Sequence, residues 1–244
     1  MRYLVLADIH ANLEALEAVL ADAAPAGYDQ VLVLGDLVGY GGDPGAAIER
    51  TLGLQPAAIV RGNHDKVCAG LEPAMLFNDV ARQSAEWTAD VLSPAHRAAL
   101  AALPAGPRLV TDQLEICHGA PFDEDYYVFD LDDAARALDA AAARICLFGH
   151  THVPAVFATP DDPVRHGGAG GADLTLPSSG PVLVNVGSVG QPRDGDARAA
   201  YGLLDLDAGT LRLCRAVYDV ARAQARIRAA GLPDWLAARL ARGQ

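Results

Sequence analysis

Several features that define whole classes of protein are missing from this sequence of 244 residues. No uncharged apolar run approaches the ~18–20 residues of a membrane-spanning helix, so we expect no membrane partner. The five apolar residues at 3–7 are too few for the core of a signal peptide. Cysteine is scarce, and none of the four forms a CxxC pair. We therefore expect a cytoplasmic protein in which the cysteines are buried apolar side chains: Cys68, Cys117, Cys146 and Cys214.

Positive charge is also in short supply. Nineteen lysines and arginines stand against 31 aspartates and glutamates, for a formal net charge of −12. Long nucleic acids bind mainly through clustered basic side chains, so we expect no such partner. Small phosphate-bearing substrates stay open, because bound cations can reverse the local field. The lone lysine, Lys66, indicates only a composition bias, and the sequence gives no indication of oligomeric state.

Short apolar runs alternate with segments of helical period in the first half of the chain. Strand-like runs at 3–7, 30–36 and 57–60 are separated by helical patterns at 13–23 and 43–53. This strand–helix alternation predicts a parallel sheet with right-handed crossovers.

The second half is rich in strands. Residues 73–103 are predicted to be helical, with Asn78 and Ser93 as N-caps. Further helices are expected at 131–143, 219–230 and 234–242. The expected strands are 114–119, 145–150, 155–159, 182–187, 201–206 and 211–217. Two facing sheets with helices outside would bury both halves, so the expected class is α/β, a two-sheet β-sandwich flanked by helices.

We expect a single domain over 1–244, because this length and a hydrophobic content of 51% can supply one large core. The helical segment 66–105 is expected to shape the functional site. The stretch 160–180 is rich in Gly, Pro and Ser, which predicts a flexible surface hairpin or loop.

Seven good metal ligands come directly after apolar, strand-like runs. Each alone is explained by a turn, a cap or a surface histidine, but their recurrence indicates one shared site of the two-metal hydrolase type. If its strand is still extended there, Asp8 and His10 leave the same face and can share an ion. The seven residues are Asp8, His10, Asp36, Asn63, His118, His150 and His152.

Other catalytic patterns are missing. There is no GxSxG elbow, P-loop or HExxH helix. A donor set of nitrogen and oxygen without thiolate suits Mn, Fe, Co, Ni or Zn better than Ca, and we expect two divalent ions, Mn²⁺ in vitro. Cys117 precedes His118, but in a strand its side chain points to the opposite face, which favours packing over ligation.

Taken in order, these blocks resemble the five signature blocks of the calcineurin-like metallophosphoesterases. They are DIH (8–10), GDLVGYG (35–41), GNHD (62–65), HG (118–119) and GHTH (149–152). The stretch NVGSVGQPRD (185–194) further resembles the small bacterial and archaeal phosphodiesterase branch. Ala11 departs from the pattern, since close relatives often have glycine there. The resemblance implies two packed β-sheets flanked by helices, in agreement with the alternation above.

The resemblance also implies roles for the donors. One metal would be held by Asp8, His10, Asp36 and His152, and the second by Asp36, Asn63, His118 and His150. His64 would be the catalytic imidazole, oriented by Asp65. A hydroxide activated by both metals is expected to attack phosphorus, with His64 protonating or stabilising the leaving alkoxide.

Substrate contacts are less sharply indicated. Asn12 is placed to touch phosphate, although an N-cap of the helix at 13 explains it better. Arg193 suits a bidentate phosphate contact or an ion pair with Asp194 or Asp196. Four aromatic residues are candidates for a leaving-group pocket or for the core: Tyr40, Phe77, Tyr126 and Tyr127.

The resulting interpretation is a metal-dependent phosphoesterase acting on small phosphodiesters or phosphomonoesters. A protein serine/threonine phosphatase is one alternative. A non-catalytic interaction module that reuses the fold is another, and it predicts eroded ligand positions, whereas all the key positions are intact here.

Overall fold

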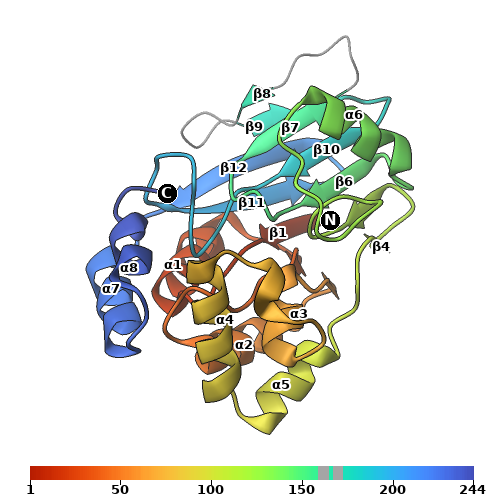
Figure 1. The fold of residues 1–244 in the computed structure, drawn as a ribbon. Coiled ribbons are helices and arrows are strands. Elements are labelled where there is room, and N and C mark those ends of the chain that lie inside the picture. Colours follow the sequence, from red (N-terminus) through yellow and green to blue (C-terminus); the bar gives the residue numbers. More distant parts are fainter. Residues whose placement is uncertain (159–164, 167–172) are drawn as a thin grey trace.

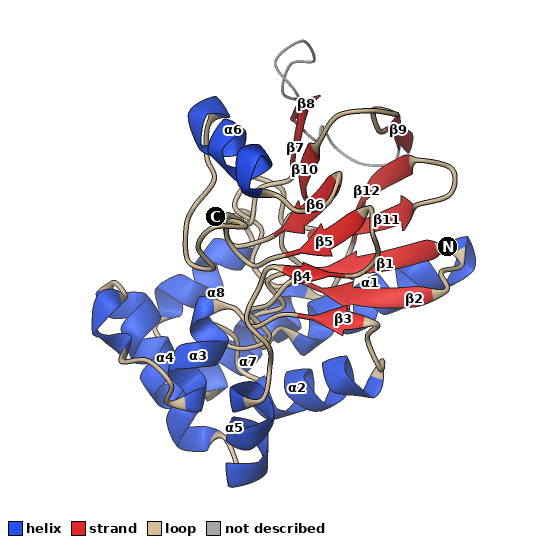
Figure 2. Cartoon of the chain, turned by 90° about the vertical axis from the view of Figure 1, so that its right-hand side faces the viewer, coloured by secondary structure: helices blue, strands red, loops and turns tan. Residues whose placement is uncertain are grey.

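The computed structural model describes residues 1–158, 165–166 and 173–244, and within these residues the strands form two six-stranded mixed sheets. Their packing, with helices outside, confirms the expected α/β sandwich (Figures 1 and 2). The first sheet has the order β3 (Ala58–Ile59), β2 (Gln30–Val33), β1 (Arg2–Leu6), β11 (Ala199–Asp205), β12 (Thr210–Ala216) and β9 (Asp173–Thr175). The second has the order β4 (Arg108–Leu109), β5 (Leu114–Ile116), β6 (Ile145–Phe148), β10 (Val182–Asn185), β7 (Ala155–Ala158) and β8 (Arg165–His166).

Three apolar layers hold the sandwich together. Strand β1 illustrates the pattern: Tyr3 and Val5 face the second sheet, whereas Leu4 and Leu6 face the helices, because successive side chains of a strand point to opposite faces. The helices are α1 (Leu13–Ala23), α2 (Pro44–Gly53), α3 (Asn63–Ala69), α4 (Asp79–Val91), α5 (Pro94–Ala101), α6 (Leu131–Ala140), α7 (Val220–Ala229) and α8 (Asp234–Leu240), with short 3₁₀ turns η1 (Ala24–Ala26) and η2 (Ala74–Leu76). Helix α6 covers the second sheet and the others lie on the side of the first (Figure 2).

Capping residues set several helix starts where the sequence places them. Asn78 accepts from the N–H of Ala81 at 3.0 Å, and Ser93 accepts from that of His96 at 3.1 Å. Each satisfies a backbone donor that the first helical turn leaves free. The expected helices at 73–103 are therefore α4 and α5, with η2 before them.

Six parallel strands direct the functional residues to one end of the sandwich. Strands β1, β2 and β3 are parallel in the first sheet, and β5, β6 and β10 are parallel in the second. Ligand sites in open α/β sheets gather at the carboxyl ends of such strands. Every donor block follows one of these strands.

Three details differ from the sequence-based expectations. Strands β1, β2 and β6 end at Leu6, Val33 and Phe148, before the donors that follow them. Helix α3 begins at Asn63, which periodicity over so short a segment did not indicate. Within 160–180, β8 pairs with β7 and β9 pairs with β12. The rest of this stretch falls largely on residues outside the described ones.

Among the described residues, no helix combines the length and apolar character needed to cross a membrane.

Candidate metal site

The fold brings the seven predicted donors together in two groups that share Asp36. We call them the donor cluster. Ligand atoms of Asp8, His10, Asp36 and His152 all lie within 4.8 Å of one another, and so do those of Asp36, His118 and His150. Asn63 joins the second group, with its Oδ1 3.2 Å from Nε2 of His118. This is the grouping that the family resemblance implies.

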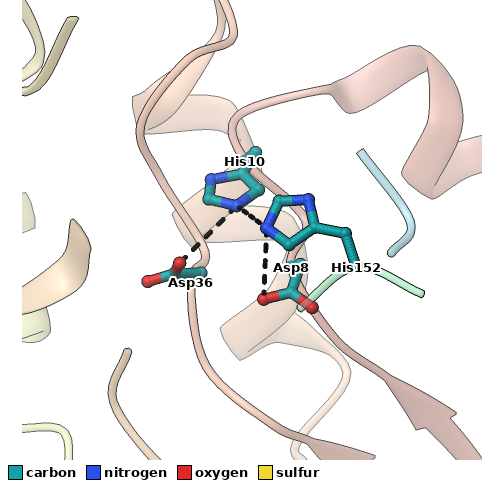
Figure 3. Close-up of side chains that lie close together, drawn as sticks. All are labelled: Asp8, His10, Asp36 and His152. Atoms are coloured by element: carbon teal, nitrogen blue, oxygen red, sulfur yellow. Dashed lines mark hydrogen bonds and ion pairs between the residues drawn. The ribbon is translucent and has the colours of Figure 1, made fainter. Parts of the chain in front are cut away.

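Asp36 lies between the two groups. Its Oδ2 is 3.5 Å from Nε2 of His10 and 3.4 Å from Nε2 of His118. In the first group, Nε2 of His152 is 3.1 Å from Nε2 of His10 and 3.8 Å from Oδ1 of Asp8 (Figure 3). One carboxylate oxygen thus faces both sets of imidazoles, which suits a ligand that bridges two ions.

Backbone carbonyls fix the orientation of the four histidines of the donor cluster. Nδ1 of His10 donates to Val38 at 2.9 Å, and Nδ1 of His152 donates to Gln191 at 2.6 Å. A carbonyl oxygen only accepts, so the proton is on that nitrogen and the other nitrogen turns a lone pair toward the cluster. The remaining two histidines are oriented in the same way, His118 through Nδ1 to Leu34 at 2.8 Å and His150 through Nε2 to Asp125 at 3.0 Å, so that their other ring nitrogens face the cluster.

This orientation fits cation binding. Burial lowers the pKa of His10 and of His152 well below the usual value, so both are neutral near pH 7. Their bare nitrogens face each other at 3.1 Å, where two lone pairs repel unless a cation lies between them. Imidazole and carboxylate donors without thiolate suit a divalent ion such as Mn²⁺ or Zn²⁺.

Charge at the bridging position is balanced by the second group. Burial by itself would raise the pKa of Asp36, but His118 and His64 hold it well below its usual range. Burial likewise opposes a charge on His118, yet Asp36 raises the pKa of His118 to about 10. Burial raises the pKa of Asp8 to about 7. Two carboxylates buried this closely create a strong local demand for positive charge.

Left-handed backbone delivers the donors. Asp8 and His10 have φ of 53° and 49°, so the extended geometry assumed from the sequence is wrong: they share a face because two turns bring them together. Such conformations are costly for residues with a Cβ and concentrate at functional sites. Of eight non-glycine residues with positive φ in the described part of the chain, seven lie at or beside the cluster: Asp8, His10, Ala11, Asp36, Tyr40, His150 and His152.

Ala11 and Gly62 show what the tight packing requires. Ala11, where the resemblance expects glycine, has φ of 50°, a conformation that glycine adopts without strain. Gly62 precedes α3, and a Cβ there would lie 2.1 Å from Oδ1 of Asp36. Only glycine lets the loop pass this close to the carboxylate.

His64 and Asp65 lie beside the cluster but do not form the expected pair. Both oxygens of Asp65 accept backbone N–H groups, from Leu37 at 2.9 Å and Gly62 at 3.0 Å. The predicted Asp65–imidazole contact is therefore wrong: the carboxylate ties the loop after β2 to the start of α3. Nδ1 of His64 is buried without a hydrogen-bond partner in the described structure, and burial lowers the pKa of His64 to about 4.

Lys66 is a site residue that the sequence interpretation missed. Its side chain is only 2% exposed, and Nζ binds Asp125 at 2.6 Å, Glu72 at 3.1 Å and Glu124 at 3.2 Å. Asp125 is also the residue whose carbonyl orients His150. The signal was present: a chain that otherwise uses arginine has its one lysine directly after GNHD. A compact ammonium reaches three carboxylates that a planar guanidinium would not fit.

Two of the predicted substrate contacts have clear outcomes. Asn12 is committed elsewhere, because Oδ1 accepts from the N–H of Ala15 at 3.1 Å and Nδ2 donates to Gly190 at 2.9 Å. It is an N-cap, and the phosphate contact is not supported. For Arg193 the ion-pair alternative is wrong, since Asp194 binds Arg215 and Asp196 binds Arg198.

Arg193 instead faces the site. Its guanidinium carbon is 5.8 Å from the centre of the Tyr40 ring, and one nitrogen donates to Gln191 at 3.1 Å. Its Nε is buried without a hydrogen-bond partner among the described residues. The Tyr40 ring packs 4.7 Å from that of His10 and 4.4 Å from that of His64. Both side chains therefore border the cluster.

The other aromatic candidates divide. Phe77 packs 4.6 Å from His64, and Tyr127 stacks on His150 at 3.7 Å. Tyr126 points elsewhere: its hydroxyl donates to Asp133 at 2.7 Å and its ring packs on Phe122. Cys117 is buried in the layer between the second sheet and α6, as predicted, and all four cysteines are free.

Comparisons with known proteins agree with this geometry. A family model described as the calcineurin-like phosphoesterase superfamily domain matches residues 1–209. An uncharacterized protein of Methanocaldococcus jannaschii, MJ0912, is 32% identical over 249 aligned positions, covering 98% of this chain and 97% of the relative. A crystal structure of a metallophosphoesterase from Sphaerobacter thermophilus is 39% identical, with a TM-score of 0.90 and full coverage of both chains. The hypothetical protein PH1004 of Pyrococcus horikoshii shares the fold, with a TM-score of 0.81 at 20% identity over 100% of this chain and 98% of that one.

Proposed function

The chain belongs to the calcineurin-like phosphoesterase superfamily and is a metallophosphoesterase, and we propose that it hydrolyses small phosphodiesters at the donor cluster. The observation that carries this proposal is the pair of buried His/Asp groups joined by Asp36. In the assignment, Asp8, His10, Asp36 and His152 hold one divalent ion. Asp36, Asn63, His118 and His150 hold the other.

Two divalent ions, when bound, supply a water made acidic enough to attack at neutral pH and a positive field for the phosphoester. The protein's part is to keep the ligands fixed. Hydrogen bonds to Val38, Leu34 and Gln191 hold three imidazoles with their free nitrogens inward, so little reorganisation is needed during the reaction.

His64 acts on the leaving group in this proposal. Its backbone N–H donates to Oδ1 of Asp36 at 2.9 Å, which fixes the residue beside the bridging carboxylate. Burial keeps the imidazole neutral near pH 7, and an anionic phosphoester beside it would favour the protonated form. The protonated ring can then donate to the departing alkoxide.

Arg193 is assigned to the phosphate. A guanidinium with an unused buried donor, bordering a cluster that would attract anions once two cations are bound, suits a charge-assisted hydrogen bond to a phosphoryl oxygen. Tyr40 supports it by packing against both the guanidinium and His64. Asn12 has no place in this assignment, because both polar atoms of its side chain are used within the fold.

A hydrolysis panel tests the proposal. The protein is stripped of metal, reloaded with Mn²⁺, Zn²⁺, Fe²⁺, Co²⁺ or Ni²⁺, and assayed on bis-p-nitrophenyl phosphate, p-nitrophenyl phosphate and a phosphoserine peptide. We expect Mn²⁺ to restore activity and the diester to be preferred. Preference for the monoester would reject the diester assignment, and preference for the peptide would favour a protein phosphatase. Inactivity with every metal would reject the proposal that the protein hydrolyses phosphoesters.

A further inference from the structure

A cavity of about 270 Å³ opens directly beside the donor cluster. We call it the aromatic cavity, and we propose that it binds a nucleoside as the leaving group of the phosphoester, an inference that rests on the proposed function. Its lining comes from the loop after β2, from α3, from the segment that joins α3 to α4, and from the loop before α6. The lining includes Tyr40, His64, Glu72, Leu76, Phe77 and Tyr127.

Position points to the leaving group. His64 and His150 line the cavity and also belong to, or border, the donor cluster. A phosphoryl group held at the cluster would therefore have one ester oxygen directed past His64 into this space. His64 is the proposed proton donor to that oxygen, so the alcohol that departs is the one the cavity receives.

The walls suit a flat, largely apolar group. The rings of Tyr40 and Phe77 lie 4.4 Å and 4.6 Å from that of His64, and Tyr127 contributes a third ring. Leu76 lines the same space and is 85% exposed, so a ligand there can remove apolar surface from water. A planar base would cover these groups, and aromatic rings stack on any base because each base has a π-face.

Charge selects a neutral leaving group that donates hydrogen bonds. Asp125 and Glu72 line the cavity with side chains 43% and 41% exposed. With Glu124 they carry three negative charges against the two positive charges of Lys66 and Arg61. Carboxylate oxygens accept from sugar hydroxyls and base amino groups but repel further phosphates. A nucleoside meets both conditions, because it carries hydroxyl and amino donors and has no charge of its own.

The test reaction is hydrolysis at phosphorus with the nucleoside as the leaving alcohol. A water oxygen bonds to phosphorus, the bond from phosphorus to O5′ breaks, and the departing oxygen takes a proton. The methyl ester of adenosine 5′-phosphate then gives adenosine and methyl phosphate. Cleavage on the other side would give methanol and adenosine 5′-phosphate, so the products report which alcohol occupied the cavity.

The experiment compares that ester with the methyl ester of ribose 5-phosphate, which has the same primary alkoxide and no base. With Mn²⁺-loaded enzyme we expect adenosine as product and a kcat/KM about ten-fold or more higher for the adenosine ester, the size of one stacking contact. Phe77→Leu removes a flat ring but keeps apolar volume, and should bring the ratio toward one. Tyr28→Leu is the matched control, since Tyr28 is half-buried just before β2, at the opposite end of the strands, and should leave the ratio unchanged.

A ratio near one in the wild type, or a ratio that Phe77→Leu does not change, would overturn the inference. An added 3′-phosphate on the adenosine ester should slow hydrolysis about ten-fold because of the acidic wall, and equal rates would also overturn it. Hydrolysis of bis-p-nitrophenyl phosphate is measured alongside. If that activity is present while the ratio is one, only the nucleoside assignment fails; if it is missing with every metal, the proposed function fails.

Discussion

The donor cluster and the aromatic cavity share a boundary at His64 and His150 but are built in opposite ways. The cluster consists of polar side chains that follow the strand ends and are at most 3% exposed apart from Asn63, and five of its seven residues have left-handed backbone. The cavity is lined by apolar and acidic side chains, several of them exposed, from a helical segment and a long loop. The sheets therefore position the metal-binding side chains, whereas the choice of leaving group depends on helical and loop segments that pack beside the sheets. Substitutions within the cluster, at its boundary with the cavity and outside both regions test this comparison.

The largest effect is expected from Asp36→Asn. Asp36 offers an oxygen to both donor groups, so we expect loss of both ions and a fall in turnover of at least about 10⁴-fold on every substrate. Metal content and kcat are measured together. Asp8→Asn is the comparison, because Asp8 belongs to the first group alone and should cost one ion. Retention of two ions by Asp36→Asn would contradict the bridging assignment.

His64→Ala comes next. We expect turnover to fall about 10²–10⁴-fold while two ions stay bound, because His64 contributes a proton transfer and is not a ligand. The measurement is kcat on p-nitrophenyl and methyl esters of one phosphodiester series. The loss should be greater for the methyl ester, whose poor leaving group needs the proton; equal losses would contradict the assigned role.

Lys66→Met acts across the boundary between the two regions. Lys66 binds Asp125, whose carbonyl orients His150, so its loss should weaken the second ion about 10–100-fold and leave the first group nearly unchanged. Stepwise metal titration measures both affinities. Lys66→Arg, which restores the charge, should recover only part of the affinity. Equal weakening of the two ions would indicate a purely structural role.

Arg193→Ala should reduce kcat/KM about 10–100-fold with metal content unchanged. This is the fold-change expected when one charge-assisted hydrogen bond to the phosphate is lost. Arg198→Ala is the matched control, because Arg198 lies in the same loop and pairs with Asp196. If the two variants behave alike, Arg193 does not contact the substrate.

Asn12→Ala should have the smallest effect on catalysis. Loss of the N-cap of α1 should lower the free energy of unfolding by about 1 kcal/mol, while kcat/KM changes little. Denaturant unfolding and steady-state kinetics separate the two. A large fall in kcat/KM with unchanged stability would restore the phosphate contact that the structure argues against.

The sequence was most informative where local pattern decides the outcome. Apolar runs such as 3–7 and 145–150 predicted strands, and the order of blocks such as GNHD and GHTH predicted which residues would meet. Their meeting place follows from parallel strands ending at one edge of each sheet. The strands themselves ended a few residues early, because the polar donors leave the sheet by left-handed turns that no periodicity records.

Other features depended on contacts between distant segments. Asp65 binds the N–H of Leu37 rather than the neighbouring imidazole, and Lys66 binds carboxylates more than fifty residues away. Tyr126 and Tyr127 are adjacent, yet one packs on Phe122 and the other on His150. These partners are chosen by tertiary packing, which explains why the aromatic cavity was less visible in the sequence than the donor cluster.

The central claim is that the donor cluster binds a pair of divalent ions. Anomalous diffraction from crystals soaked in Mn²⁺ tests it most directly. The account predicts two peaks, one among Asp8, His10, Asp36 and His152 and one among Asp36, Asn63, His118 and His150. A single peak, or peaks away from Asp36, would contradict it.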